Sequence, residues 1–141
     1  MIHTEIDIGA PVERVWDVLT DFEAYRNWNT FMPRFSGTPT VGSVVRFRIA
    51  PPDSRAMDIK ALVLAATPAQ ELRWRGGLPV PGLFSGEHGF HLEAAGAGRT
   101  HLVQEERFRG LLVPIFGAML RKTERGFEAM NAALKARCES A

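Results

Sequence analysis

The sequence predicts an α+β fold in which a curved antiparallel sheet wraps around a long C-terminal helix. Apolar and polar residues alternate in the first segment and again in several segments across the middle of the chain, as in strands with one buried face. The last segment instead repeats its apolar residues at helical spacing for about six turns. Two short helical patterns follow the first strand. A sheet that curls around a terminal helix leaves a cavity between the two, and we expect the function to depend on it.

Length and composition limit the class of protein. The chain has 141 residues, of which 45% are hydrophobic and 23% charged, so we expect one soluble globular domain over residues 1–141. The net charge of +1 gives no reason to expect nucleic acid or an anionic membrane as a partner. No signal peptide and no apolar stretch of membrane-spanning length is present, which predicts a cytoplasmic protein without stable membrane insertion. The single cysteine, Cys138, excludes an internal disulfide and fits a reducing compartment.

The N-terminal part is predicted to form one strand and two short helices. Residues 2–8 alternate with a period of two, and the next apolar residues recur at helical spacing. Pro11 suits the first turn of that helix. Asp21 can cap a second short helix that carries Phe22 and Tyr25.

Alternating segments separated by turns are predicted to form the rest of the sheet. The inner, mostly apolar face is expected to contain Val45, Phe47, Ile49, Met57, Ile59, Ala61, Val63, Leu72, Trp74, His88, Phe90, Leu92, Leu102, Gln104, Glu106 and Phe108. The opposite face carries the basic residues Arg46, Arg48, Lys60, Arg73, Arg75, Arg107 and Arg109. Acidic residues lie among these cations, so a solvated outer face explains them better than an interaction surface.

The C-terminal segment is predicted to be one long helix that begins at Pro114. Lys135 and Arg137 suit its negative end, and the inner face of the sheet is the apolar surface large enough to cover it. Gly117 and Gly126 each cost about 1 kcal/mol relative to alanine inside a helix. They permit close packing, leave room for a ligand, or are simply tolerated.

Three segments carry a resemblance to a known family. They are EIDIGAPVERVWDVLTDFEAYRNWNTFMP (Glu5 to Pro33), LRWRGG (Leu72 to Gly77) and ERFRGLL (Glu106 to Leu112). With the order of the elements, they resemble the helix-grip fold of the START and birch-pollen-allergen superfamily (SRPBCC), in its polyketide cyclase/dehydrase and lipid-transport branch. The resemblance covers nearly the whole chain and implies a single START-like domain. Superfamily members include ligand carriers, aromatases and cyclases, hormone receptors and co-chaperones, so it implies a fold more specifically than a function.

The inner face of the sheet and the apolar face of the long helix are predicted to line the cavity. The candidate apolar residues are Phe47, Ile49, Met57, Ile59, Trp74, Phe90, Leu92, Phe108, Phe116, Met119 and Leu120. Core filling is the better explanation for any one of them, but as a set they favour a pocket for a small hydrophobic molecule. The polar candidates for ligand binding are His88, Gln104 and Glu106.

Glu106 and His88 are the candidates for chemistry. A desolvated carboxylate among apolar side chains can act as a general acid or base, or accept a hydrogen bond from a ligand hydroxyl. His88 could polarise a ligand carbonyl or pair with Glu106. Alternatively, a register shift would place Glu105 inside and Glu106 in water, or Glu106 would lie at the cavity mouth without a chemical role.

No metal or cofactor is expected. His88 and His91 are three residues apart on a strand, so they point to opposite faces. The sequence contains no cysteine pair, no HExxH motif and neither of the glycine-rich phosphate-binding motifs. Ser36, Ser43 and Ser85 lack an evident base and orienting acid, so a serine nucleophile is unsupported.

Three classes of function remain. The first is binding of a small hydrophobic ligand such as a lipid, a polyketide or an aromatic metabolite. The second is a cyclase, dehydratase or aromatase that uses Glu106 and His88, and the third is an interaction module like the co-chaperone members. The lack of a complete acid/base set favours the first. The apolar loop 78–84, with Phe31, Met32 and Phe35, is expected to surround the cavity entrance and to act as a lid.

Overall fold

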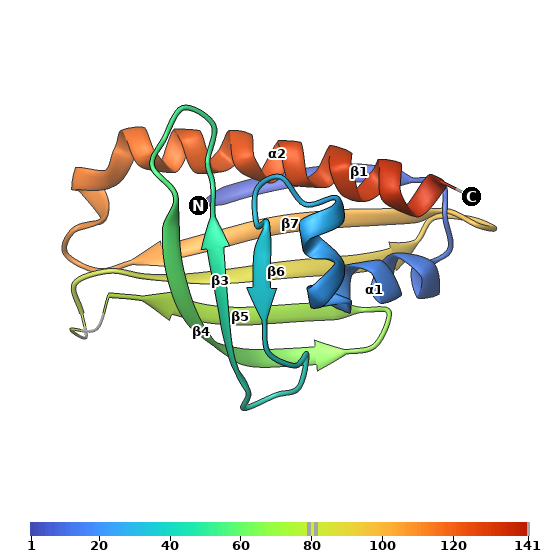
Figure 1. The fold of residues 1–141 in the computed structure, drawn as a ribbon, viewed down its shortest axis with the longest axis horizontal. Helices are drawn as coiled ribbons and strands as arrows, with labels where there is room; N and C mark the ends of the chain where they lie inside the picture. Colours follow the sequence, from blue (N-terminus) through green and yellow to red (C-terminus); the bar gives the residue numbers. More distant parts are fainter. Residues whose placement is uncertain (79, 81, 141) are drawn as a thin grey trace.

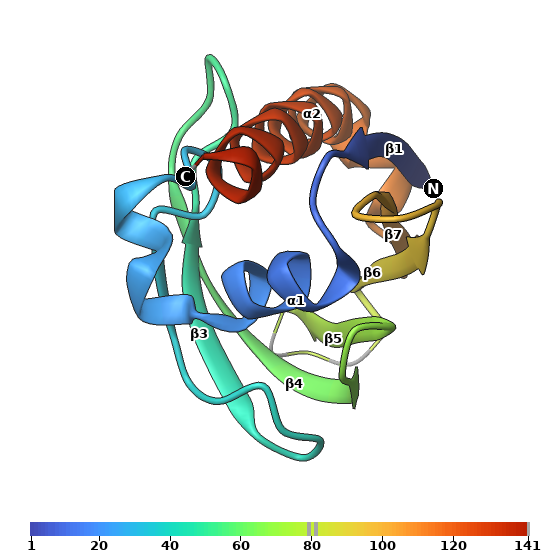
Figure 2. The same ribbon diagram turned by 90° about the vertical axis from the view of Figure 1, so that its right-hand side faces the viewer.

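The sheet and the long helix follow the predicted architecture. The computed structural model describes residues 1–78, 80 and 82–140. Seven antiparallel strands form one sheet in the order β1-β7-β6-β5-β4-β3-β2. The strands are β1 Ile2–Ile8, β2 Arg34–Ser36, β3 Val44–Ile49, β4 Met57–Thr67, β5 Glu71–Gly77, β6 Ser85–Ala94 and β7 Thr100–Arg109. The sheet curls around the C-terminal helix, which confirms the helix-grip fold (Figures 1 and 2).

The helices differ from the prediction at their boundaries. They are α1 Val12–Thr20, the 3-10 helix η1 Phe22–Asn27, the 3-10 turn η2 Val113–Phe116 and α2 Gly117–Glu139. The second short helix is therefore 3-10, and the Asp21 side chain makes no capping hydrogen bond. The long helix begins at Gly117, because the residues around Pro114 form the separate turn η2. Figure 2 shows α2 across the open side of the curved sheet and α1 inside the curve. No helix of the described residues is long and apolar enough to cross a membrane.

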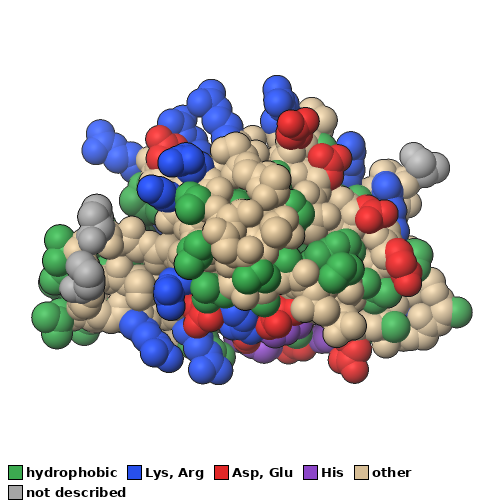
Figure 3. All heavy atoms as spheres, turned by 90° about the horizontal axis from the view of Figure 1, so that it is seen from below, with side chains coloured by type: hydrophobic (Ala, Val, Ile, Leu, Met, Phe, Trp, Pro, Cys, Tyr) green, Lys and Arg blue, Asp and Glu red, His purple; other side chains and the backbone are tan. Residues whose placement is uncertain are grey.

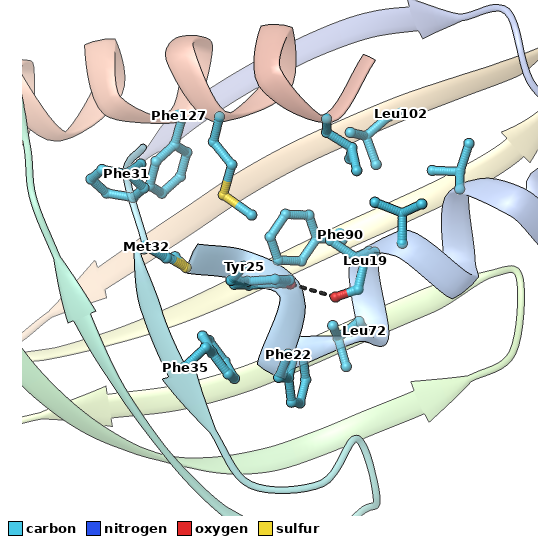
Figure 4. Packing of buried hydrophobic residues seen from close by; sticks show 14 of the residues in the cluster. Leu19, Phe22, Tyr25, Phe31, Met32, Phe35, Leu72, Phe90, Leu102 and Phe127 are labelled. Atoms are coloured by element: carbon cyan, nitrogen blue, oxygen red, sulfur yellow. Dashed lines mark hydrogen bonds between the residues drawn. The ribbon is translucent and has the colours of Figure 1, made fainter. Parts of the chain in front are cut away.

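At one end of the molecule, buried side chains fill the space inside the curved sheet. The aromatic rings of Phe22, Tyr25 and Phe35 pack together under η1 and β2, and the Tyr25 hydroxyl donates a hydrogen bond to the Leu19 carbonyl (Figure 4). Burial raises the pKa of the Tyr25 phenol, so this hydroxyl stays a donor. Phe35 is fully packed in this core, so the expectation that it surrounds a cavity entrance is wrong.

Gly126 permits the close approach of α2 to the aromatic core. A Cβ atom at this position would overlap the ring of Phe31, which itself packs edge-on against Phe127 with ring centroids 5.6 Å apart. Gly126 therefore permits close packing of the helix, which is one of the three explanations considered for the glycines of this segment. At Gly117 the nearest atom to a Cβ would be a side-chain nitrogen of Arg121 at 3.8 Å, which is ordinary contact.

The register of the central strands brings three side chains into one row on the inner face. His88 on β6 lies opposite Trp74 on β5 and opposite Glu106 on β7. In the next row, Gly86 lies opposite Gly76 and Phe108. The basic residues predicted for the outer face are exposed at Arg46, Lys60, Arg75, Arg107 and Arg109 and half-buried at Arg48 and Arg73.

Candidate functional site

A small apolar cavity lies between the inner face of the sheet and α2. Its volume is about 80 Å³. Its walls are Phe31, Met32, Phe47, Ile49, Met57, Ile59, Trp74, Gly76, Gly77, Phe84, Gly86, His88, Glu106, Phe108, Met119, Leu120, Thr123 and Phe127. An engineered cavity of roughly 150 Å³ in another protein holds one benzene molecule. A larger ligand would therefore require these walls to move apart.

Most of the predicted cavity residues lie on its wall. These are Phe47, Ile49, Met57, Ile59, Trp74, His88, Glu106, Phe108, Met119 and Leu120. Whether they bind a ligand stays a prediction, because wall position alone is also compatible with a core.

Four predicted cavity residues lie elsewhere. Phe90 and Leu92 are further along β6, where the core is filled, and the ring of Phe90 packs behind that of His88 with a centroid distance of 4.8 Å. Gln104 is fully buried behind His88. Phe116 lies in η2 and packs edge-on against the wall residue Phe84 at 4.9 Å. The alternation of a strand gives the face of a residue but not its position along the sheet, so it could not exclude Phe90, Leu92 and Gln104 from the wall. Their part in ligand binding, like that of Phe116, stays a prediction.

Several wall residues were not predicted as such. Thr123 and Phe127 follow Met119 at intervals of four residues, so helical spacing could have added them. Phe31 and Met32 come from the connection after η1 and are buried, so they form the inner wall and not an exposed entrance. The glycines of the wall carry no side-chain pattern that could have revealed them.

Gly86 makes room for the carboxylate of Glu106. A Cβ atom at Gly86 would overlap Oε2 of Glu106, so any other residue there would displace the carboxylate. Oε1 of Glu106 lies 3.2 Å from Nδ1 of His88. The side chain of Glu106 is 17% exposed and that of His88 is 4% exposed. The pair is therefore a nearly enclosed polar contact on an otherwise apolar wall.

Aromatic side chains hold the imidazole of His88 in place. The ring of Trp74 stacks on it with centroids 4.9 Å apart and 24° between the planes. The ring of Phe127 contacts it from α2 at 4.6 Å. Packing of this kind fixes the rotamer of a side chain that carries a functional group.

Behind His88, a buried chain of hydrogen bonds reaches β1. Oε1 of Gln104 lies 2.9 Å from Nε2 of His88. Nε2 of Gln104 donates to Oδ1 of Asn131 at 2.6 Å, and Nδ2 of Asn131 donates to Oγ1 of Thr4 at 2.9 Å. All four residues are buried. Such a satisfied network specifies one arrangement of its members, because an unpaired buried polar group is costly.

The contacts of Glu105 and Glu106 show which of these two residues faces the cavity. Glu105 faces outward and contacts His3 at 3.2 Å and His91 at 3.5 Å, whereas Glu106 faces the cavity.

Histidines and carboxylates also pair elsewhere on the outer face, where His101 contacts Asp7 at 2.7 Å. Figure 3 shows histidines beside carboxylates along one edge of the molecule. Within the described residues, no group of three or more His, Cys, Asp or Glu side chains is arranged to hold a metal ion.

A wider groove on the outside is open to solvent. It has a volume of about 1110 Å³, lies beside η1, β2, β3 and β4, and is lined by both cations and carboxylates, including Arg34, Lys60 and Asp58. Arg48 and Asp58 form an ion pair of 3.0 Å within it. A groove that is open to solvent does not enclose a hydrophobic ligand, so the inner cavity is the better candidate site.

A curved antiparallel sheet closed by a long helix, with an apolar cavity between them, defines a helix-grip domain. The family model described as polyketide cyclase / dehydrase and lipid transport matches residues 2–139. The chain belongs to this family. Comparison with curated proteins gives no significant match.

Solved structures share the fold at low sequence identity. The Zhui aromatase/cyclase from Streptomyces sp. R1128 has a TM-score of 0.79 and 18% identity, over 98% of this chain and 92% of that chain. A START superfamily protein from Mycobacterium smegmatis has a TM-score of 0.76 and 18% identity, over 98% and 96%. A truncated norcoclaurine synthase from Thalictrum flavum has a TM-score of 0.75 and 13% identity, over 99% and 93%. At these identities the likeness shows the fold alone.

Proposed function

We propose that this protein binds a small hydrophobic molecule, such as a lipid, a polyketide or an aromatic metabolite, in the cavity between the sheet and α2. One observation carries the proposal, namely the enclosed apolar wall that is interrupted by the hydrogen-bonded pair of His88 and Glu106. A cavity of this kind gives a ligand apolar contact and a few polar groups that fix its orientation. Burying a carboxylate is costly even when it is paired, so Glu106 favours a polar role at the cavity over core filling alone.

The end of the cavity near Phe84 is the proposed entrance. Exposed apolar side chains surround this end at Leu78, Val80 and Leu111, and Leu111 is 80% exposed. Opening at this end would enlarge the cavity. Pro79 and Pro81 of the proposed lid lie outside the described residues. The lid is tested by hydrogen exchange of residues 78–84 with and without saturating ligand, and unchanged exchange would refute it.

The experiment that tests the binding function is native mass spectrometry of the protein purified from its own source, followed by denaturing extraction. We expect one co-purifying hydrophobic molecule. Substitution Met119→Trp fills the cavity from its wall and should release that molecule. Ile115→Trp is the matched control, since Ile115 lies one turn away, is 73% exposed and should leave the molecule bound. A protein without a ligand that recovers a stoichiometric protein partner would favour the interaction module instead.

One observation also supports a second candidate function, namely a polyketide cyclase, dehydratase or aromatase activity. Glu106 and His88 form a 3.2 Å pair at the cavity, where they would act as the acid and base on a bound ligand. Glu106→Gln keeps the shape and removes the ionisable group. A carrier should keep most of its affinity, whereas an enzyme should lose turnover with binding intact.

A further inference from the structure

The chain of hydrogen bonds behind His88 has a fixed direction. Oγ1 of Thr4 donates to the backbone carbonyl of Gln104 at 2.8 Å, so it accepts from Nδ2 of Asn131. Oδ1 of Asn131 must then face Nε2 of Gln104, which also lies 3.4 Å from the backbone carbonyl of Phe127. Backbone carbonyls only accept, so both ends of the Gln104 amide are determined. Oε1 of Gln104 therefore faces His88 as an acceptor.

This direction determines which nitrogen of His88 carries hydrogen. Nε2 must donate to Oε1 of Gln104, since two acceptors do not form a hydrogen bond. A neutral imidazole would then present the lone pair of Nδ1 to the carboxylate of Glu106, at 3.2 Å. The pair consequently holds one further hydrogen between Nδ1 and Oε1, bonded to either atom.

In both placements of that hydrogen, Oε2 of Glu106 remains an acceptor. It is a carboxylate oxygen if the hydrogen is on His88, and the carbonyl oxygen of the acid if the hydrogen is on Oε1. Oε2 lies above Gly86 on the cavity wall and has no hydrogen-bond partner among the described residues. The other polar side chain of the wall, Thr123, donates its hydroxyl hydrogen to the Met119 carbonyl at 2.9 Å. The polar side chains of the wall thus offer acceptors and no free donor.

We propose that Gln104, Asn131 and Thr4 are positioning residues that hold the hydrogen on Nε2 of His88, and that Oε2 of Glu106 thereby accepts a hydrogen bond from a hydroxyl group of the ligand. The ligand class is a hydrophobic phenol, enol or alcohol. This inference rests on the proposed binding function and names the polar group that the cavity selects.

The positioning role is tested first on the unaltered cavity. In protein labelled with nitrogen-15 histidine, replacement of the surface histidines His3, His91 and His101 by glutamine leaves only the signals of His88. We expect hydrogen on Nε2 of His88 in the folded protein. Hydrogen on Nδ1 with a bare Nε2 would overturn the inference. Gln104→Met removes the acceptor that faces Nε2 of His88. This variant should therefore give a mixture of imidazole tautomers, with hydrogen on Nε2 in some molecules and on Nδ1 in others.

The ligand class is tested with phenol and toluene, which differ by a hydroxyl in place of a methyl group. The ratio of their affinities, measured by titration calorimetry, should shift against phenol by about tenfold in Glu106→Met, since the hydrogen bond that Oε2 accepts from the phenol hydroxyl is lost. Glu105→Met is the matched control on the outer face and should leave the ratio unchanged. An equal ratio in wild type and Glu106→Met overturns the inference while the binding function stands. Binding of neither probe, with no co-purifying molecule, overturns the binding function and this inference with it.

Discussion

The carboxylate of Glu106 occupies the space that a side chain at Gly86 would need. The two residues come from adjacent strands, and Gly86 lies one row beyond His88, the direct neighbour of Glu106. Glycine at position 86 of β6 is thus as necessary to the site as the Glu106 carboxylate on β7.

Gly86→Ala is expected to displace the Glu106 carboxylate and to break its contact with His88. The displaced atoms are the end of a flexible side chain, so the main cost is the lost contact with His88, on the order of 1 kcal/mol of the free energy of unfolding. Urea denaturation gives this cost, and the imidazole signals of His88 report the lost contact. Gly89→Ala on the same strand is the control, since its Cβ would meet Arg73 at an ordinary 3.5 Å. Equal stability of the two variants would contradict the prediction.

The two glycines of α2 should respond oppositely to alanine. Gly126→Ala forces the helix away from the ring of Phe31 and should destabilise the protein by about 1–3 kcal/mol. Gly117→Ala meets no close neighbour and should stabilise the protein slightly, by less than the about 1 kcal/mol of a helix interior, because Gly117 is the first residue of α2. Chemical denaturation of both variants checks the sign of each change. If the free energy of unfolding changed in the same direction in both variants, packing against Phe31 would not be what determines the effect of alanine at position 126.

The buried chain of hydrogen bonds predicts a large effect at Asn131. Asn131→Leu removes the acceptor of Gln104 and the donor to Thr4, and leaves buried polar atoms without these partners. The expected loss is about 1–3 kcal/mol of the free energy of unfolding. A double-mutant cycle with Thr4→Val should give non-additive losses, because the two side chains are in direct contact. Strict additivity would mean that the contact contributes no coupling energy.

The histidines of the outer face predict a dependence of stability on pH. Hydrogen bonds with Asp7 and with Glu5 raise the pKa of His101 above its usual 6.5, and those with Glu5 and Glu105 raise the pKa of His3. A raised folded-state pKa stabilises the protein fully below the unfolded value, and this stabilisation is lost as the pH rises through the folded values. The same hydrogen bonds lower the pKa of Glu5 and of Asp7 below their usual 4.5 and 3.8, so on the acid side stabilisation is lost as the pH falls through the lowered values.

This dependence is measured by urea denaturation of the wild type and of a variant with His3→Gln and His101→Gln. The wild type should exceed the variant in stability at about pH 5.5, and the difference should shrink at about pH 8.5 as the imidazoles lose their protons. Both histidines are well exposed, so the effect is small and weakens in salt. A difference that does not change with pH would exclude these contacts as its source.

The thiol of Cys138 should react slowly in the folded protein. It is 5% exposed, and burial raises its pKa to about 11. A thiol reagent at neutral pH should therefore modify it only after unfolding in urea, since the thiolate is the reactive form. Fast modification without denaturant would mean that the C-terminal end of α2 opens readily.

The period of two in the strands predicted correctly which face each residue takes. It placed Trp74, His88 and Glu106 on the inner face, and it put His91 on the other face from His88. Periodicity carries no information on distance along the strand, so Phe90 was assigned to the cavity although it lies in the filled core.

Other features depend on interactions that no local pattern records. β2 has three residues, too few for alternation to identify it. α2 starts at Gly117, after the separate turn η2, and η1 is a 3-10 helix whose Phe22 and Tyr25 lie in the aromatic core. The need for glycine at position 86 comes from a carboxylate 20 residues further along the chain. Such requirements arise between strands and become visible only once the register is known.

Two backbone hydrogen bonds join the proposed lid to the connection before α2. Leu111 donates to the carbonyl of Gly82 at 3.0 Å, and Leu112 donates to that of Leu83 at 2.9 Å. A molecule that entered between these two segments would have to break both hydrogen bonds on the way in and again on the way out. The association and dissociation rates of such a ligand would then share one barrier that belongs to the protein.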